Sequence, residues 1–457
     1  MGQTRARGTL FLLVVAALAA AASGFAAQEA ALPELQVPPL PAGSVSQIPL
    51  ERALTLSEAI SIALYAQPQL ALARYTAEAA RGRVRQAESG YFPTVDISAA
   101  HTRTGPNTGG GVGTTAGGAF TSGGYTTSFS GRELIWDSGA TPASVGQARS
   151  QAESARRALA QARLDTINRV KQAYYTLLQN QELLGVQRQN VDDQKAHLNL
   201  AKARFEAGTT ARADVVRAEA AVADAVLNLA SAQNAVAAAR VTLNLSLGMD
   251  VRTPTRVEET QEKGPAGLEA ATLVEQALAD RPAMEQSRAD VEAAREALRG
   301  ARASNRPGLF LNGSYGLRGS SFPPGDRSWS YGVSMSWPLL NVGLTAGRVQ
   351  ESEANLLGAE TRLRQTELSV GSEVVQGYLS VQTARQKVTA AEAEVASAEE
   401  SLRLATGRYE TGVAVYIEVI DAETAALTAR TNLVNGRYAL STSLAALEAA
   451  LGLEQGE

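Results

Sequence analysis

The chain has 457 residues, of which 45% are hydrophobic but only 5% aromatic, and its formal net charge is −4. This alanine-rich composition favours helices packed closely side by side. The absence of cysteine excludes disulfides, thiol catalysis and cysteine metal sites. The slightly negative net charge does not indicate a nucleic-acid-binding protein. The two histidines, His101 and His197, are not paired in the sequence, and no catalytic set is visible, so we expect no metal, no cofactor and no enzymatic activity.

Residues 1–26 have the pattern of a secretory signal peptide. Arg5 and Arg7 precede the apolar run TLFLLVVAALAAAA (9–22), and small residues follow up to the expected cleavage site. The alternative is a membrane anchor, but about 14 apolar residues are too few to span a bilayer comfortably. Without a cysteine at the cleavage site, a lipid anchor is excluded. Residues 27–53 are rich in proline and are expected to form an extended lead-in.

The rest of the chain reads as an internal duplication. The segment ARFEAG ends at Gly208 and the segment GRYETG ends at Gly412, an offset of 204 residues (412 − 208 = 204). The same offset relates tyrosine, asparagine and further glycine positions on either side of these motifs. We therefore divide the chain into a first repeat at 54–250, a linker at 251–267 and a second repeat at 268–454.

Each repeat is predicted to begin with a helix of about 35 residues, over 56–90 and 270–304. Pro93 and Pro307 prevent each helix from continuing. Two strands follow in each repeat. The alternation is clearest in WSYGVSMSW (329–337), where large apolar residues alternate with serine and glycine.

These strands have two interpretations. They form either a half-buried soluble hairpin or part of a transmembrane barrel that turns its apolar face to lipid. We favour the barrel because the signal peptide indicates export, and because no later stretch approaches the roughly 18 uninterrupted apolar residues of a membrane-spanning helix. The aromatic residues expected at the membrane interface are Tyr125, Tyr315, Trp329, Tyr331 and Trp337. His101 shares the apolar strand face and is expected at the same interface.

A long helix is predicted over 143–207 and again over 347–411, where proline is absent. Some 65 residues correspond to roughly 100 Å of helix, which favours coiled-coil-like packing. Gly208 and Gly412 end these helices, and a returning helix follows each of them. The two shorter helices of each repeat together match the long helix in length, so laid end to end they would pack along it. His197, within the first long helix, is expected to be solvated.

This order of elements, present twice, resembles the outer membrane efflux proteins, the TolC-like channel-tunnel family. The motif R-[FY]-x-x-G-x-x-x-x-x-[DE]-[VL] carries the resemblance. It appears as RFEAGTTARADV (204–215) and as RYETGVAVYIEV (408–419). The resemblance extends over nearly the whole mature chain.

The resemblance implies an α+β membrane protein in which long coiled-coil-like helices form a periplasmic α-barrel. It also implies a homotrimer in which each chain gives four β-strands to a 12-stranded outer-membrane β-barrel, and four strands alone could not close one. The implied location is the outer membrane of a Gram-negative bacterium, with the helices extending into the periplasm. The implied partners are outer-membrane lipid, a periplasmic adaptor (membrane fusion) protein and an inner-membrane pump.

The resemblance further assigns residues at the periplasmic end. Glu418 and Asp421, which share a helix face, would form an acidic gate. Asp214 and Tyr409 correspond to positions that link helices and hold the tip shut. The alternative for the acid pair is a solvated helix face.

The residues around the two turns are expected to contact the adaptor. They are Arg204, Phe205, Gly208, Arg408 and Gly412. The family resemblance also places an arginine two residues after the second turn glycine, but Ala414 stands there. One closing salt bridge is therefore absent, and another residue such as Arg212 would have to replace it.

The sequence thus predicts an outer-membrane exit duct of a tripartite efflux system, which conducts substrates passively and carries an acidic gate at its periplasmic tip. One alternative is an outer-membrane duct for type I protein secretion. Another is a periplasmic coiled-coil scaffold without channel activity.

Overall fold

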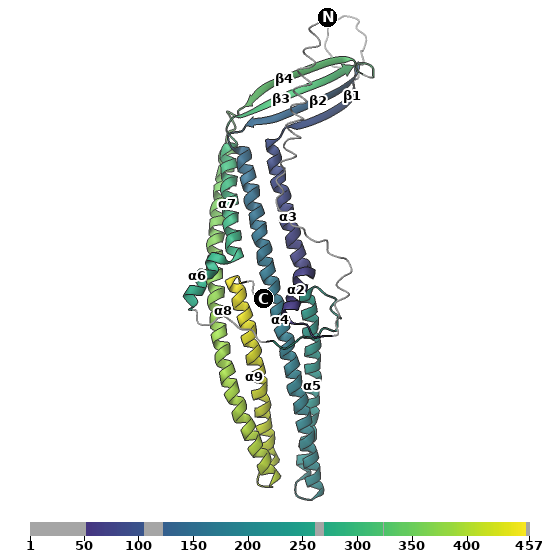
Figure 1. Cartoon of the computed structure of the whole chain (residues 1–457), viewed down its shortest axis with the longest axis vertical. Coiled ribbons are helices and arrows are strands. Elements are labelled where there is room, and N and C mark those ends of the chain that lie inside the picture. Colours follow the sequence, from purple (N-terminus) through teal and green to yellow (C-terminus); the bar gives the residue numbers. More distant parts are fainter. Residues whose placement is uncertain (1–51, 105–121, 261–268, 323, 454–457) are drawn as a thin grey trace, which may run out of the picture. The chain divides into compact units, whose positions relative to one another are not determined.

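The computed structural model describes residues 52–104, 122–260, 269–322 and 324–453. The predicted signal peptide and all but the last two residues of the predicted lead-in lie outside this part of the chain. The same order of helices and strands occurs twice within it (Figure 1). Among the described helices, none combines the length and the hydropathy that crossing a bilayer requires.

Each half begins with two short helices, the second of which starts at a proline. They are α2 (Leu56–Ala66) and α3 (Pro68–Glu88) in the first half, and α6 (Ala270–Asp280) and α7 (Pro282–Ala303) in the second. The prediction of one continuous helix in each region is therefore wrong. A proline disfavours helical backbone in the residue before it, and Gln67 and Arg281 accordingly have extended ψ angles of 119° and 128°.

Four strands form one antiparallel sheet in the order β1-β2-β3-β4. They are β1 (Thr94–Thr104), β2 (Ser122–Trp136), β3 (Gly308–Gly319) and β4 (Asp326–Ser336). A short 3₁₀ turn, η2 (Ser89–Tyr91), leads from α3 towards β1. The strand pairs of the two halves join along β2 and β3 (Figure 1), which leaves β1 and β4 at the two edges of this sheet.

The strand register separates apolar from polar side chains. One row across the sheet contains Ile97, Phe129, Tyr315 and Trp329. The next row, on the opposite face, contains Asp96, Ser130, Ser314 and Ser330. Hydroxyl groups on the polar face bind one another, as in the 2.8 Å contact between the Oγ atoms of Ser98 and Ser128. Ile97 and Trp329 are 67% and 60% exposed, so the apolar face is uncovered in the single chain.

Two long helices follow the strands. They are α4 (Ala140–Glu206) and α8 (Leu344–Glu410), each of 67 residues, or roughly 100 Å at 1.5 Å per residue. The returning helices are α5 (Arg212–Leu247) and α9 (Tyr416–Leu451). α5 packs along α4 and α9 packs along α8, so each half contains a helical hairpin (Figure 1). The predicted long helices and their returns are confirmed.

The shorter helices meet end to end beside α4. Gly248, at the end of α5, has φ +74°, and a Cβ there would lie 2.7 Å from the carbonyl oxygen of Ala66. Gln67 Nε2 donates to the carbonyl oxygens of Leu245 and Ser246 at 3.3 and 3.0 Å. Since both α3 and α5 pack along α4, the short helices together line the long one, as the sequence predicts.

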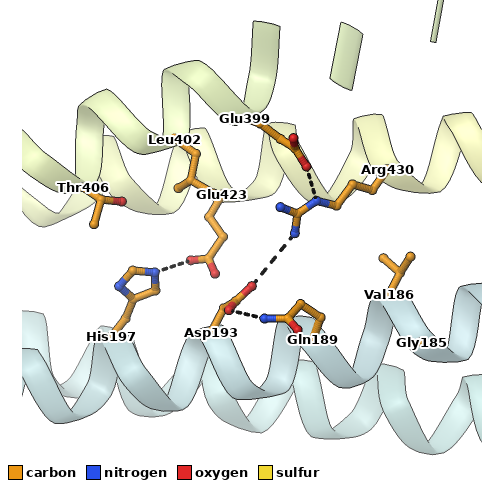
Figure 2. A pocket seen from close by; sticks show the side chains of 10 residues that line it. All are labelled: Gly185, Val186, Gln189, Asp193, His197, Glu399, Leu402, Thr406, Glu423 and Arg430. Carbon is orange, nitrogen blue, oxygen red and sulfur yellow. Dashed lines mark hydrogen bonds and ion pairs between the residues drawn. The ribbon is translucent and has the colours of Figure 1, made fainter. Parts of the chain in front are cut away.

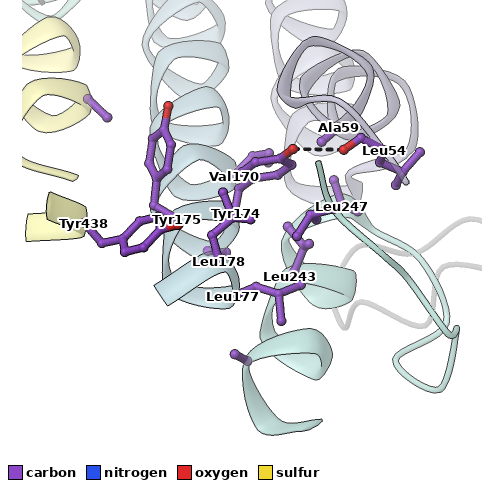
Figure 3. Packing of buried hydrophobic residues seen from close by; sticks show 14 of the residues in the cluster. Leu54, Ala59, Val170, Tyr174, Tyr175, Leu177, Leu178, Leu243, Leu247 and Tyr438 are labelled. Atoms are coloured by element: carbon purple, nitrogen blue, oxygen red, sulfur yellow. Dashed lines mark hydrogen bonds between the residues drawn. The ribbon is translucent and has the colours of Figure 1, made fainter. Parts of the chain in front are cut away.

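The largest buried cluster surrounds this junction (Figure 3). Tyr174 and Leu177 of α4 pack there with Leu243 and Leu247 of α5, all fully buried. The Tyr174 hydroxyl donates to the carbonyl oxygens of Leu54 and Glu258 at 2.9 and 2.6 Å. These bonds hold two segments against the long helix, the one before α2 and the one after α5.

Candidate functional site at the hairpin ends

The two hairpins turn back in the same way. Gly208 and Gly412 have φ angles of +71° and +80°, in the left-handed region. Beyond each glycine, a backbone N–H returns to a carbonyl five residues earlier, from Thr209 to Arg204 and from Val413 to Arg408, both at 2.9 Å. This pattern ends a helix with glycine in the left-handed position. The turn glycines are therefore required by the backbone geometry.

A small buried cluster, here called the tip cluster, joins the ends of the two hairpins. Its buried members are Ala201, Ala218, Tyr409, Ala414, Tyr416 and Val419. They come from α4, α5, α8, α9 and the second turn. Ala414, which stands where the family resemblance expects an arginine, is one of these packed side chains and is only 9% exposed.

The two tyrosines of the tip cluster pack ring to ring, with centroids 5.5 Å apart. The hydroxyl groups of Tyr409 and Tyr416 are buried and have no hydrogen-bond partner within the described part of the chain. Burial raises the pKa of Tyr416 to about 12, and the negative charge of Glu423 adds to this rise. The side chain of Tyr409, which the sequence predicts as a tip-closing residue, is therefore held by packing.

Arg204 connects the first hairpin to the second. Its Nη2 atom donates to the carbonyl oxygen of Glu410 at 2.6 Å, and its guanidinium carbon lies 4.3 Å from the centre of the Tyr409 ring. A guanidinium over an aromatic face is attracted to the ring. Arg204, which is predicted to contact the adaptor, therefore contacts the second hairpin in the single chain.

The two predicted gate acids differ in their surroundings. Glu418 forms an ion pair with Arg408, with Nη1 and Oε2 3.0 Å apart. Asp421 is exposed, and no ion pair is found for it among the described residues. The sequence presents these acids as a pair, whereas among the described residues Glu418 has an ion-pair partner and Asp421 has none.

Asp214 is held within its own turn. Its carboxylate accepts a hydrogen bond from Thr210 Oγ1 at 2.5 Å and lies 3.7 Å from Arg217 Nη1. Arg212, which the sequence offers as a replacement latch, is exposed. Within the described part of the chain, neither side chain has a hydrogen bond or ion pair to another helix.

Large apolar side chains are exposed around the turns. Val413 is 73% exposed and Val415 is 61% exposed, and Ile417 and Phe205 are also exposed. Phe205 is among the predicted adaptor contacts, whereas the other three are not. The sequence signal for them is the run VAVYI (413–417), in which alternate residues point into the tip cluster and away from it.

Farther from the turns, a cavity of about 550 Å³ lies between α4 and the second hairpin (Figure 2). His197 Nε2 faces Glu423 Oε2 across it at 3.4 Å. Burial lowers the pKa of His197, and burial together with the charge of Asp193 raises the pKa of Glu423 to about 7. The expectation that His197 is solvated is wrong, because its side chain is only 14% exposed.

Arg430 lies on the other side of this cavity, 3.0 Å from Glu399 and 4.0 Å from Asp193 (Figure 2). The cavity is thus lined by charged groups from both hairpins. No group of three or more histidine or acidic side chains that could hold a metal ion occurs among the described residues.

Four of the five predicted interface aromatics lie on the sheet, and the fifth, Trp337, directly follows β4. The rings of Trp329 and Tyr331 stack with centroids 5.8 Å apart, and Tyr315 is in the same row as Trp329. Tyr125 packs against the His101 ring at 4.4 Å. Trp337 Nε1, beyond the end of β4, donates to the carbonyl oxygen of Asn305 at 3.2 Å. Their position relative to a membrane stays a prediction.

Comparison with known proteins identifies what the chain is similar to. The family model described as outer membrane efflux protein matches residues 59–249 and 273–453. Protein CyaE of Bordetella pertussis is 28% identical over 411 residues, which cover 87% of this chain and 84% of that protein. Outer membrane protein TolC of Escherichia coli is 25% identical over 296 residues, covering 61% and 60%. The solved Campylobacter jejuni CmeC outer membrane channel superposes with a TM-score of 0.78 at 19% identity, covering 88% of this chain and 87% of that one.

Proposed function

This chain belongs to the outer membrane efflux protein family, and on that premise we propose that it is the exit duct of a tripartite efflux system. Its family membership confirms the predicted resemblance, the outer-membrane location and the expectation of a channel instead of an enzyme. One observation carries the proposal further. A sheet with an uncovered apolar face continues directly into two hairpins that are built on helices of 67 residues.

The proposed assembly is a homotrimer. The described sheet has edges at β1 and β4, and a four-stranded sheet cannot close on itself. Three copies would bring twelve strands together, with the apolar row around Phe129 and Tyr315 facing lipid and the serine-rich rows facing the lumen. In this arrangement Tyr125, Tyr315, Trp329, Tyr331 and Trp337 are the proposed membrane-interface residues.

The proposed gate lies at the hairpin ends. In a three-fold assembly, Asp421 would form a ring of three carboxylates, and Glu418 would form a second ring when it leaves Arg408. Rings of acids attract cations and raise their own pKa values. Tyr409 and Asp214 support this gate by packing and by ordering the first turn, respectively.

The proposed partners are a periplasmic adaptor and, through it, an inner-membrane pump. Exposed apolar side chains beside the turns are typical of protein interaction sites. Val413 and Val415 supply such a surface next to Gly412, and Phe205 supplies one next to Gly208. Arg408 adds a cation that its pair with Glu418 keeps in place.

Planar-bilayer recording of the purified protein tests the gate. Neutralising both acids, Glu418→Gln together with Asp421→Asn, is expected to raise single-channel conductance and to weaken block by multivalent cations. Asp224→Asn, an exposed acid of α5, is the matched control and is expected to change neither. Unchanged conductance and block in the double variant would remove these acids from the gate.

Deleting the gene distinguishes the efflux duct from a duct for type I protein secretion. The efflux duct predicts that deletion causes retention of small fluorescent efflux substrates inside the cell. The secretion duct predicts instead that a specific protein disappears from the medium while dye retention is unchanged. That second result would contradict the proposed function.

A further inference from the structure

The contact between His197 and Glu423 joins the two helical hairpins through a pair of ionisable side chains. His197 is on α4 in the first hairpin, and Glu423 is on α9 in the second. The Glu423 side chain is 7% exposed, and within the described part of the chain its two carboxylate oxygens have no well-aligned hydrogen bond, although the nearby Gln194 amide favours the charged form. A buried carboxylate without such a bond is stable only if it is protonated or if a cation neutralises it.

Among the described residues, His197 is the one basic side chain within ion-pair distance of Glu423, and Arg430 favours the charged form of Glu423 from farther away. α4 contributes Asp193, α8 contributes Glu399 and Glu410, and α9 contributes Arg430. Arg430 is shared between Glu399 and Asp193, so acids outnumber it in the cavity. The Tyr416 hydroxyl is neutral because its pKa is raised to about 12. The charge of Asp214, on α5, contributes to this rise.

We propose that His197 and Glu423 form a proton-sensitive contact between the hairpins, which holds while the pair carries a proton and loosens when that proton is lost. With one proton the pair is neutral overall, whichever of the two side chains holds it. Without a proton it leaves a buried negative charge beside Asp193. Separation of the hairpins would admit water to this charge.

The direction of the pH response follows from the two groups. The pKa of Glu423 is raised to about 7 by burial, so the closed contact binds its proton more tightly than a hydrated carboxylate does. This stabilisation is complete below the ordinary pKa of glutamate, about 4.3, and is lost as pH rises through about 7. The pKa of His197 is lowered, so protonation of His197 weakens the closed contact as pH falls. This opposite effect is confined to pH values below the ordinary histidine pKa of 6.5. Between this value and slightly alkaline pH, the contact therefore weakens as pH rises.

Distances between spin labels test this contact without reference to conduction. The chain has no cysteine, so Ala196→Cys on α4 and Ala425→Cys on α9 place labels on exposed positions of the two hairpins. In full-length protein diluted with unlabelled chains, raising pH from about 6 to about 8 is expected to shift the distance distribution to longer values. Labels at Ala196→Cys and Ala220→Cys, both in the first hairpin, are expected to show no shift.

Glu423→Gln keeps the side-chain shape but cannot ionise, so the pH-dependent shift is expected to be lost in this variant. A shift that persists in Glu423→Gln, or distances in the unmodified background that do not respond to pH, would overturn the proposal. If Glu423→Gln does not fold, infrared spectroscopy of the natural sequence replaces it. Retention of all protonated-carboxyl absorbance from about pH 6 to about pH 8 would then overturn the proposal.

The consequence for gating rests on the proposed duct function, whereas the contact itself does not. Because the pair lies near the tip cluster, its loss would favour movement of one hairpin end against the other. A pH-dependent distance in a protein that shows no conductance would contradict the duct and leave the contact intact. Conductance with a pH-independent distance would contradict the contact alone.

Discussion

At the scale of single residues, the hairpin ends distinguish two acids that the sequence presents as equivalent. Glu418 is neutralised by Arg408 at 3.0 Å, whereas Asp421 is exposed. We predict that Asp421→Asn weakens block by a trivalent cation more than Glu418→Gln does. Glu418→Gln removes an acid that is already paired, and it also frees the Arg408 cation. Blocking constants from single-channel currents measure this difference, and equal effects would show that the ion pair is absent in the channel.

A buried ion pair between the two halves makes a second residue-scale prediction. Lys171 of α4 and Glu448 of α9 are 2.7 Å apart, with side chains only 6% and 4% exposed. Lys171→Met removes the cation 2.7 Å from the buried Glu448 carboxylate, and removing one partner of a buried ion pair typically costs about 3–5 kcal/mol of folding free energy. The exposed pair of Lys202 and Glu219 offers the control, since Lys202→Met should cost about 0–1 kcal/mol. Thermal unfolding followed by circular dichroism compares the two, and similar melting temperatures would contradict the burial.

At the scale of elements, two glycines with similar backbone angles have different surroundings. Gly412 has open space where a Cβ would lie, whereas a Cβ at Gly248 would lie 2.7 Å from the Ala66 carbonyl oxygen. Gly412→Ala should therefore cost only about 1–2 kcal/mol, the penalty of the left-handed conformation. We predict a clearly larger loss for Gly248→Ala, because it also separates α2 from α5. Equal losses in thermal unfolding would show that the helix ends do not abut as described.

The elements also show how far the sequence could predict this fold. Strand alternation, the turn glycines and the long proline-free helices follow local rules, and the sequence predicts them correctly. The breaks before Pro68 and Pro282 were equally local, since proline displaces the preceding residue from helical geometry. Apolar periodicity alone predicts one helix in each region, because it does not register the effect of the proline.

The candidate site depends on contacts that local rules do not supply. α4 packs against α3, α5, α7 and α9, so apolar residues occur around much of its circumference. No single polar face therefore marks His197 as exposed or buried. The pairing of Arg408 with Glu418 likewise depends on how the second turn closes. The sequence locates the hairpin ends, but only the three-dimensional packing separates paired from unpaired charges.

At the scale of the whole molecule, the single chain leaves apolar surface uncovered along its sheet and its helices. Leu339, Leu340 and Val342 are exposed in the segment between β4 and α8, and Leu357 and Leu368 are exposed on α8. Exposed apolar patches of this kind are typical of interfaces with protein or membrane. Lipid contact on the sheet and contact between copies on the helices would cover them.

The oligomeric state in the outer membrane tests this account most directly. Membranes of cells that express the full-length chain would be fractionated, and the outer-membrane fraction would be run on SDS gels with and without heating. A trimeric duct predicts a band with the mass of three chains in the unheated sample, which converts to the single-chain mass of 47.8 kDa or less on heating. A soluble periplasmic monomer would contradict the duct and support a coiled-coil scaffold instead.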